Sequence, residues 1–172
     1  SMTTGFPAER VDKMDLGISG KVALVTGGSR GLGLQCALSL AGEGVNLAVC
    51  GRTQEPLDKA VERLGALGVD SVGMVADVSD LAGLEALHRG VVDALGPVDI
   101  LVNNVGGSRS RDDIVGTSLD DFMGTFDINL FGGFQLMKLV IPHMREQRWG
   151  RIVNIASIWG REHGGNISYM SA

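Results

Sequence analysis

The chain has 172 residues, enough for about one domain with a buried core. Its formal net charge at pH 7 is −5 and its basic residues form no run, so we expect no nucleic-acid partner. No apolar stretch reaches the roughly 18–20 residues of a membrane-spanning helix, and no hydrophobic leader is visible. We therefore expect no membrane association and a cytoplasmic location. Cys36 and Cys50 match no metal-binding spacing and are expected to be reduced thiols.

Short apolar runs alternate with amphipathic segments along most of the chain. Residues 1–19 lack this pattern and are expected to form an N-terminal arm, followed by one domain over residues 20–172. The expected strands are 21–26, 45–50, 72–76, 99–103 and 151–156. The expected helices are 31–43, 55–67, 80–95 and 118–147. This alternation predicts an α/β fold: a Rossmann-like, doubly wound parallel sheet of about five strands with helices on both faces.

Individual residues mark the ends of the expected helices. Gly44 is placed to end the first helix, and Pro56 lies in the first turn of the second, where its missing N–H is tolerated. Asp80 and Ser118 are expected N-caps of the third and fourth helices. Pro142 predicts a kink or break in the fourth helix.

A glycine-rich turn follows the first expected strand and precedes the first helix. Residues 26–33 read TGGSRGLG. Gly27 would allow a sharp turn out of the strand, Gly31 a close approach of backbone N–H groups to a pyrophosphate, and Gly33 close packing of the helix on the sheet. The N-terminus of the helix adds unpaired donors and a partial positive charge. A simple tight turn is the alternative interpretation.

The glycine spacing and five later motifs resemble the short-chain dehydrogenase/reductase family. The spacing is Thr-Gly-x3-Gly-x-Gly, unlike the Gly-x-Gly-x2-Gly of ordinary Rossmann dehydrogenases. The later matches, in chain order, are Asp77-Val78, Asn103-Asn104-Val105-Gly106, Asn129, Ser157 and Tyr169. Val105 departs from the alanine that is usual in the family. The resemblance covers residues 21 to 172.

The resemblance implies a nicotinamide cofactor and a carbonyl or alcohol substrate. The residues expected to bind the cofactor are Gly27, Ser29, Arg30, Gly31, Leu32, Gly33, Arg52, Asp77, Val78, Asn104 and Gly106. Tyr169 would exchange a proton with the substrate oxygen, Ser157 would stabilise the charge on that oxygen, and Asn129 would hold the geometry and a water.

The end of the second expected strand favours NADP(H) over NAD(H). NAD-binding proteins of this class usually place an acidic residue there to bind the ribose 2′-OH. Here Gly51 occupies that place and Arg52 follows it. Arg52 and Arg30, from the glycine turn, could together bind a 2′-phosphate through charge-assisted hydrogen bonds. The alternative is that both are solvated surface arginines.

Other candidate residues carry weaker signals. His88, His143 and His163 have no metal-ligand spacing, so we expect no metal. The loop residues Trp159, Arg161 and His163 lie between Ser157 and Tyr169, where a substrate contact competes with ordinary loop packing. The charge run 109–113 is expected to be a solvated loop. The apolar face of the fourth helix is expected to be mostly core; it comprises Phe122, Phe126, Leu130 and Phe134. Part of this helix forms a subunit interface in the family, which implies a homo-oligomer, a dimer or tetramer, in the full-length form.

The family places a lysine four residues after the tyrosine, where its charge lowers the phenol pKa from its ordinary value near 10. In this sequence Ala172 is the last residue, one position before that lysine. We therefore expect an incomplete fold in an inactive fragment of an NADP(H)-dependent oxidoreductase. The closest general resemblance is to reductases of 3-oxoacyl thioesters and to related broad carbonyl reductases, so the expected substrate rests on analogy. A non-catalytic dinucleotide-binding or sensing module is the alternative.

A comparison of two chain lengths tests this expectation. The 172-residue chain should show no measurable carbonyl reduction, because Tyr169 lacks the cation that lowers its pKa. A form extended past Ala172 to include the lysine should be active in the same NADPH-oxidation assay. Robust turnover by the 172-residue chain would contradict the expectation.

Overall fold

The computed structural model describes residues 14–158, except 111 and 114. Tyr169, Trp159, Arg161 and His163 lie outside the described residues, as does most of the expected N-terminal arm. Ser157 and all the expected cofactor-binding residues are described.

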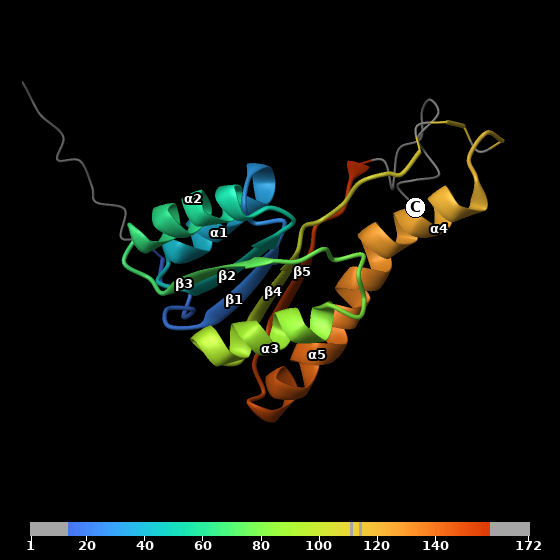
Figure 1. Ribbon diagram of the computed structural model, residues 1–172. Coiled ribbons are helices and arrows are strands. Elements are labelled where there is room, and N and C mark those ends of the chain that lie inside the picture. Colours follow the sequence, from blue (N-terminus) through green and yellow to red (C-terminus); the bar gives the residue numbers. More distant parts are fainter. Residues whose placement is uncertain (1–13, 111, 114, 159–172) are drawn as a thin grey trace, which may run out of the picture.

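Five parallel strands form one sheet, with helices on both of its faces (Figure 1). The strands are β1 (Val22–Thr26), β2 (Asn46–Gly51), β3 (Ser71–Val75), β4 (Ile100–Asn103) and β5 (Arg151–Asn154), in the spatial order β3-β2-β1-β4-β5. The helical segments are α1 (Gly31–Ala41), α2 (Gln54–Gly65), α3 (Leu84–Leu95), α4 (Leu119–Phe126), the π-helical turn η1 (Asp127–Phe131) and α5 (Gly132–Glu146). Helices α1 and α2 cover one face, and α3 and α5 cover the other (Figure 1). The predicted doubly wound Rossmann-like fold is confirmed.

The central strand β1 is buried at all five positions, as its continuous apolar run predicts. Successive side chains of a strand point to opposite faces, so β1 contributes to two separate cores. Ala23 and Val25 pack with residues of α1 and α2, whereas Val22 and Leu24 pack with residues of α3 and α5. A strand covered on both faces is held firmly, and β1 leads directly into the glycine-rich turn.

The predicted start of the third helix is wrong. Helix α3 begins at Leu84, after a series of turns, and Asp80 does not cap it. Asp77 Oδ1 accepts hydrogen bonds from the N–H and hydroxyl groups of Ser79, at 2.9 and 2.7 Å. This local side-chain bonding favours a turn over a helix. The Asp80 carbonyl then accepts from Gly83 N at 3.0 Å and extends the turn.

The predicted single helix over residues 118–147 consists of three segments. Ser118 is its N-cap as expected, because its side chain accepts from Asp121 N at 3.1 Å. The irregularity lies at the π-helical turn η1, however, and α5 continues through Pro142 without a break. The apolar face of this region is less buried than expected: Leu130 is 50% exposed and Phe134 55%.

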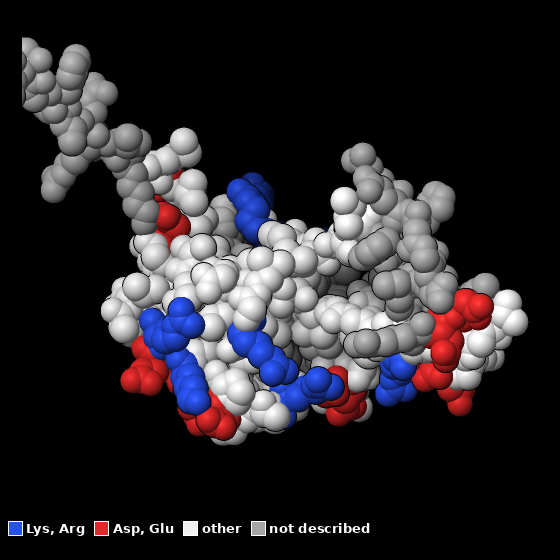
Figure 2. All heavy atoms as spheres, turned by 90° about the horizontal axis from the view of Figure 1, so that it is seen from above, with Lys and Arg blue, Asp and Glu red and all other residues white. Residues whose placement is uncertain are grey.

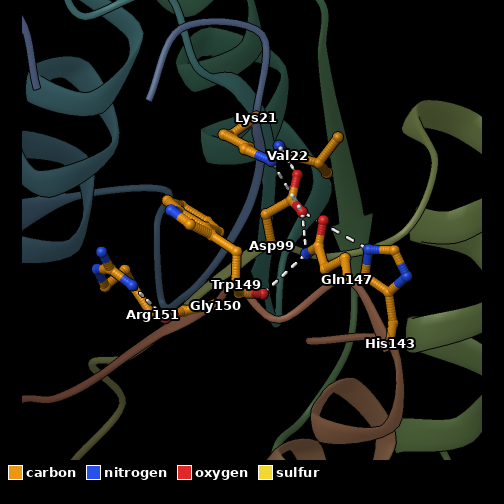
Figure 3. A network of polar contacts seen from close by, with 8 residues as sticks. All are labelled: Lys21, Val22, Asp99, His143, Gln147, Trp149, Gly150 and Arg151. Atoms are coloured by element: carbon orange, nitrogen blue, oxygen red, sulfur yellow. Dashed lines mark hydrogen bonds and ion pairs between the residues drawn. The ribbon is translucent and has the colours of Figure 1, made fainter. Parts of the chain in front are cut away.

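Asp99 fixes the amino-terminal edge of the sheet (Figure 3). One carboxylate oxygen, Oδ2, accepts from Val22 N of β1 at 3.0 Å, and Oδ1 accepts from Gln147 Nε2 at 2.6 Å. Lys21 Nζ and His143 Nε2 lie 3.8 and 3.6 Å from Oδ1. The Asp99 side chain is only 11% exposed, so these contacts join β1, β4 and the end of α5 in a partly desolvated setting.

Removing the Asp99 carboxylate should destabilise the fold. We expect Asp99→Ala to lower the free energy of unfolding by about 2–3 kcal/mol, because Val22 N–H and Gln147 lose a buried charged acceptor. The control Asp93→Ala alters an exposed carboxylate on α3 and should stay within about 0.5 kcal/mol. Urea unfolding of the two variants would measure the difference; equal losses would refute this role of Asp99.

Candidate cofactor and active site

The predicted site residues that the structure describes lie toward the carboxyl-terminal edge of the sheet. In an open parallel sheet, a crevice forms at this edge where the strand order reverses, which here is between β1 and β4. The residues that follow the strand ends are Gly27–Gly33 after β1, Arg52 after β2, Asp77 and Val78 after β3, Asn104 and Gly106 after β4, and Ser157 after β5. Figure 2 views the molecule from above Figure 1 and shows basic side chains spaced among acidic ones.

The backbone of the glycine-rich turn requires glycine at several positions. Gly27 and Gly31 have φ values of +63° and +55°, in the left-handed region that side chains rarely adopt. A Cβ at Gly33 would lie 2.4 Å from Gly27 O and 2.5 Å from Asn104 Nδ2. Gly28 donates its N–H to Cys50 O of β2 at 3.2 Å. The turn is therefore a compact unit packed against its neighbours.

The start of α1 is open on the side that a ligand would approach. A Cβ at Gly31 would meet nothing within 4 Å among the described residues. Arg30 precedes the helix in an extended conformation and gives it no side-chain cap. An uncapped helix N-terminus directs N–H groups and a partial positive charge outward, which suits a phosphate. These features fit a pyrophosphate held by the turn.

Thr26 and Asn104 join β1 to β4 beside this turn. The Thr26 hydroxyl accepts from Asn104 N and Val105 N, at 2.9 and 3.2 Å. It also donates to Val102 O at 3.4 Å. In return, Asn104 Nδ2 donates to Thr26 O at 2.9 Å and contacts Gly27 O at 3.5 Å. The Asn104 side chain, predicted to contact the cofactor, therefore holds the glycine-rich turn in place.

The expected adenosine side of the site lacks an acidic residue at the end of β2. Gly51 occupies that place, and a Cβ there would lie 3.1 Å from Ser29 Oγ. Arg52 and Arg30 are both exposed. Hydrogen bonds from Ser79 are the main reason that the Asp77 pKa lies below its ordinary value, and the nearby charges of Arg52 and Arg109 lower it further. Asp77 therefore stays ionised near neutral pH.

Arg109 is exposed, as expected for a solvated loop, and it also contacts α4 at this edge. Its side chain lies against buried Gly124 of α4, where a Cβ would come within 2.4 Å of Arg109 Cδ. Its backbone N–H donates to Thr125 Oγ1 at 3.3 Å. Loops that follow parallel strands often carry functional residues, so the position of Arg109 could have been selected from the sequence. Its contact with α4 could not, because no sequence pattern predicts it.

Asn129 lies in the π-helical turn and binds the loop that follows β4. Its Oδ1 accepts from Gly107 N at 2.9 Å, and its Nδ2 donates to Gly107 O at 2.7 Å and Thr125 O at 2.8 Å. The side chain therefore holds the loop that follows β4, and its expected catalytic role stays a prediction. The π-helical turn could not be foreseen from a sequence with ordinary helical periodicity.

A cavity of about 200 Å³ lies between the sheet and the η1–α5 segment. Its lining includes Thr26, Asn103, Asn129 and Asn154 together with apolar side chains. Ser157, three residues beyond the end of β5, is exposed. Burial in the core beneath α3 and α5 raises the pKa of the Cys50 thiol to about 11, so this cysteine stays protonated near neutral pH.

No group of three potential metal-ligating side chains occurs among residues 14–158. In the same part of the chain, no helix has the length and apolar character needed to cross a bilayer.

A glycine-rich turn at the switch point of a doubly wound sheet defines a dinucleotide-binding α/β fold. The family model described as short chain dehydrogenase matches residues 21–172, and the chain belongs to this family of oxidoreductases. Curated relatives include a ketoacyl reductase, HetN, from Nostoc sp., which is 36% identical over 145 residues. The 3-oxoacyl-[acyl-carrier-protein] reductase FabG of Staphylococcus aureus is 39% identical over 141 residues.

The alignments with these relatives cover most of this chain and only part of each relative. They include 84% of this chain and 50% of HetN, and 81% of this chain and 57% of FabG. The chain thus spans about half the length of the curated relatives it matches.

Solved structures of related dehydrogenases have the same fold. An NAD+-bound xylitol dehydrogenase superposes with a TM-score of 0.82 at 34% identity, covering 90% of this chain and 59% of that one. A 7α-hydroxysteroid dehydrogenase complexed with NADH and 7-oxo glycochenodeoxycholic acid gives a TM-score of 0.84 at 28% identity. That match covers 90% of this chain and 60% of that one.

A methyl group at Gly33 should disrupt the turn. We expect Gly33→Ala to weaken NADPH binding at least about tenfold and to cost about 1–3 kcal/mol of stability, because the added Cβ overlaps Gly27 O. Gly65→Ala, at the end of α2, is the matched control, since its Cβ meets nothing within 4 Å. Fluorescence titration and thermal unfolding would measure both variants. Unchanged NADPH affinity in Gly33→Ala would refute the proposed cradle.

Proposed function

We propose that this chain is the NADP(H)-binding part of an oxidoreductase that transfers a hydride between nicotinamide and a carbonyl or alcohol substrate. The geometry of the glycine-rich turn is the observation that carries the proposal. The turn packs closely against its neighbours at Gly33, whereas the start of α1 at Gly31 is open and has no side-chain cap. The cofactor supplies or accepts the hydride when bound. The protein's contribution is to bind, to orient the substrate and to move one proton.

The backbone groups of the turn would hold the pyrophosphate. The N–H groups of residues 31–33 lie at the start of α1, where both hydrogen bonding and the helix dipole favour an anion. Leu32 is 58% exposed and would flank the cofactor. Asp77 and Val78, after β3, would bind the adenine, with the ionised Asp77 carboxylate accepting from its amino group. Gly106 would keep the opposite wall free of a side chain.

The choice of NADP(H) rests on this chain's own residues. Gly51 places no negative charge at the end of β2, and Ser29 Oγ lies beside it. A phosphate there would gain hydrogen bonds from the Ser29 hydroxyl and from the guanidinium groups of Arg30 and Arg52. The structural relatives contain NAD+ or NADH, so their cofactors give no support for this preference.

The proton would be exchanged by Tyr169. Its phenol would donate to the developing alkoxide in reduction and accept the proton back in oxidation. Ser157 would hydrogen-bond the same oxygen and stabilise its charge. Asn129 would act through the backbone of Gly107, which it holds from both sides. Because the phenol has an ordinary pKa near 10, a nearby cation is needed for activity at neutral pH.

The substrate class follows from the relatives. Both HetN and FabG carry names of ketoacyl reductases, so we favour 3-oxoacyl thioesters as substrates. We also propose a cytoplasmic homo-oligomer for the full-length form. Leu119, Met123, Leu130 and Phe134 on α4–α5 are each at least 46% exposed, and a subunit interface would bury them.

Cofactor titrations test the 2′-phosphate site. The unaltered chain should bind NADPH more tightly than NADH, and Arg52→Gln should weaken NADPH binding roughly 10- to 100-fold by removing a charge-assisted contact. NADH affinity should stay unchanged. Arg63→Gln, which removes an exposed arginine in the last turn of α2, is the matched control. Equal affinity for the two cofactors, or tighter NADH binding, would refute the preference.

A further inference from the structure

We propose that Asn154 is a positioning residue that sets the place of Ser157 by binding the side chain of Asn103. The proposal rests on the proposed function, because it concerns the distance between the substrate-binding hydroxyl and the bound cofactor. Asn154 is the last residue of β5, and Ser157 lies three residues after it in the chain.

At its final position β5 is held to β4 by a side-chain bond as well as a backbone bond. Asn103 and Asn154 are opposite each other in the parallel register of β4 and β5. Asn103 Nδ2 donates to Asn154 Oδ1 at 2.9 Å, and Asn103 O accepts from Ile155 N at 2.9 Å. Asn103 thus binds both the side chain of Asn154 and the backbone of Ile155, at the point where β5 ends and the segment with Ser157 begins.

The Asn103 amide is itself confined. Gly133 of α5 lies so close that a Cβ there would be 3.2 Å from both Cγ and Nδ2 of Asn103. Its Oδ1 atom is buried and has no partner within the described part of the chain. The bond to Asn154, which lies in an exposed setting, therefore helps to fix which way the amide faces, and its loss would leave the half-buried Asn103 side chain without this partner.

The neighbouring residue connects the same strand to the cofactor turn. Asn104 binds Thr26 and contacts the carbonyl of Gly27, so β4 carries the glycine-rich turn on one side and β5 on the other. A shift of β5 at its last residue would therefore change the distance from Ser157 to the bound cofactor without disturbing the glycine-rich turn.

This arrangement predicts an effect on catalysis with no effect on cofactor binding. A displacement of about 1 Å between reacting groups can lower rates by up to about two orders of magnitude. Asn154→Leu keeps the side chain's approximate size and removes the acceptor, whereas Asn154→Asp keeps an acceptor at the Oδ1 position. The first should lose activity and the second should retain most of it.

The experiment compares three variants in the form extended past Ala172, with NADPH and an acetoacetyl thioester. We expect Asn154→Leu to lower kcat at least about tenfold while the KM and Kd for NADPH stay within about twofold. Asn154→Asp should keep kcat within about threefold of the unaltered protein. The control Asn46→Leu removes an equivalent bond, since Asn46 Oδ1 accepts from Asp70 N at 3.1 Å at the start of β2. It should leave kcat unchanged.

Three results would overturn the proposal. In the first, Asn154→Leu and Asn46→Leu have the same kcat. In the second, Asn154→Leu weakens NADPH binding as much as it lowers kcat, which indicates general loss of structure. In the third, Asn154→Asp is as impaired as Asn154→Leu. If the unaltered extended form itself binds no NADPH and reduces no thioester, the proposed function fails, and this proposal fails with it.

Discussion

The hydroxyl group of Thr26 holds the two central strands together at the edge where the cofactor would bind. It accepts from two consecutive backbone N–H groups after β4 and donates to Val102 O, while its own carbonyl accepts from Asn104. Only 2% of Thr26 is exposed, so these bonds are shielded from water and fix the geometry closely. The glycine-rich turn starts at the next residue, and its position relative to β4 follows from this contact.

The two edges of the sheet differ in their contacts, since one stabilises the fold and the other carries the candidate site. At the amino-terminal edge, Asp99 joins β1, β4 and α5 through a partly buried carboxylate, whose contacts stabilise the fold (Figure 3). At the carboxyl-terminal edge, Asn104 and Asn103 hold β1 and β5 to β4, and the loops beyond them present backbone N–H groups and exposed side chains. This division agrees with the general placement of ligand sites in open parallel sheets.

Much of the fold could be predicted from the sequence because its strands are buried on both faces. A run such as residues 22–26 can only be covered by helices on two sides, and the glycines at 27, 31 and 33 are required by φ values and close contacts that the structure contains. The start of α3 was not predictable from a capping rule. The Asp77 side chain accepts a hydrogen bond from Ser79 N–H, and this contact stabilises a turn where the rule predicts the first helical residues. The π-helical turn at 127–131 contains Asn129, whose contact with Gly107 joins segments 22 residues apart and has no local signal in the sequence.

The contributions of Arg109 and Asn154 were likewise hidden in the sequence. Each depends on a partner far along the chain, Gly124 of α4 for the first and Asn103 of β4 for the second. Local sequence patterns indicate which residues are buried and where turns occur. Contacts between residues of different elements become visible only when the arrangement of the strands and helices is known.

The central claim is that backbone N–H groups at the start of α1 bind the cofactor's pyrophosphate. Two-dimensional NMR of the 15N-labelled chain, titrated with NADPH, tests it directly. The amide signals of Gly31, Leu32 and Gly33 should move most and saturate together with the fluorescence titration. Saturable binding that leaves those three signals in place while others move would contradict it.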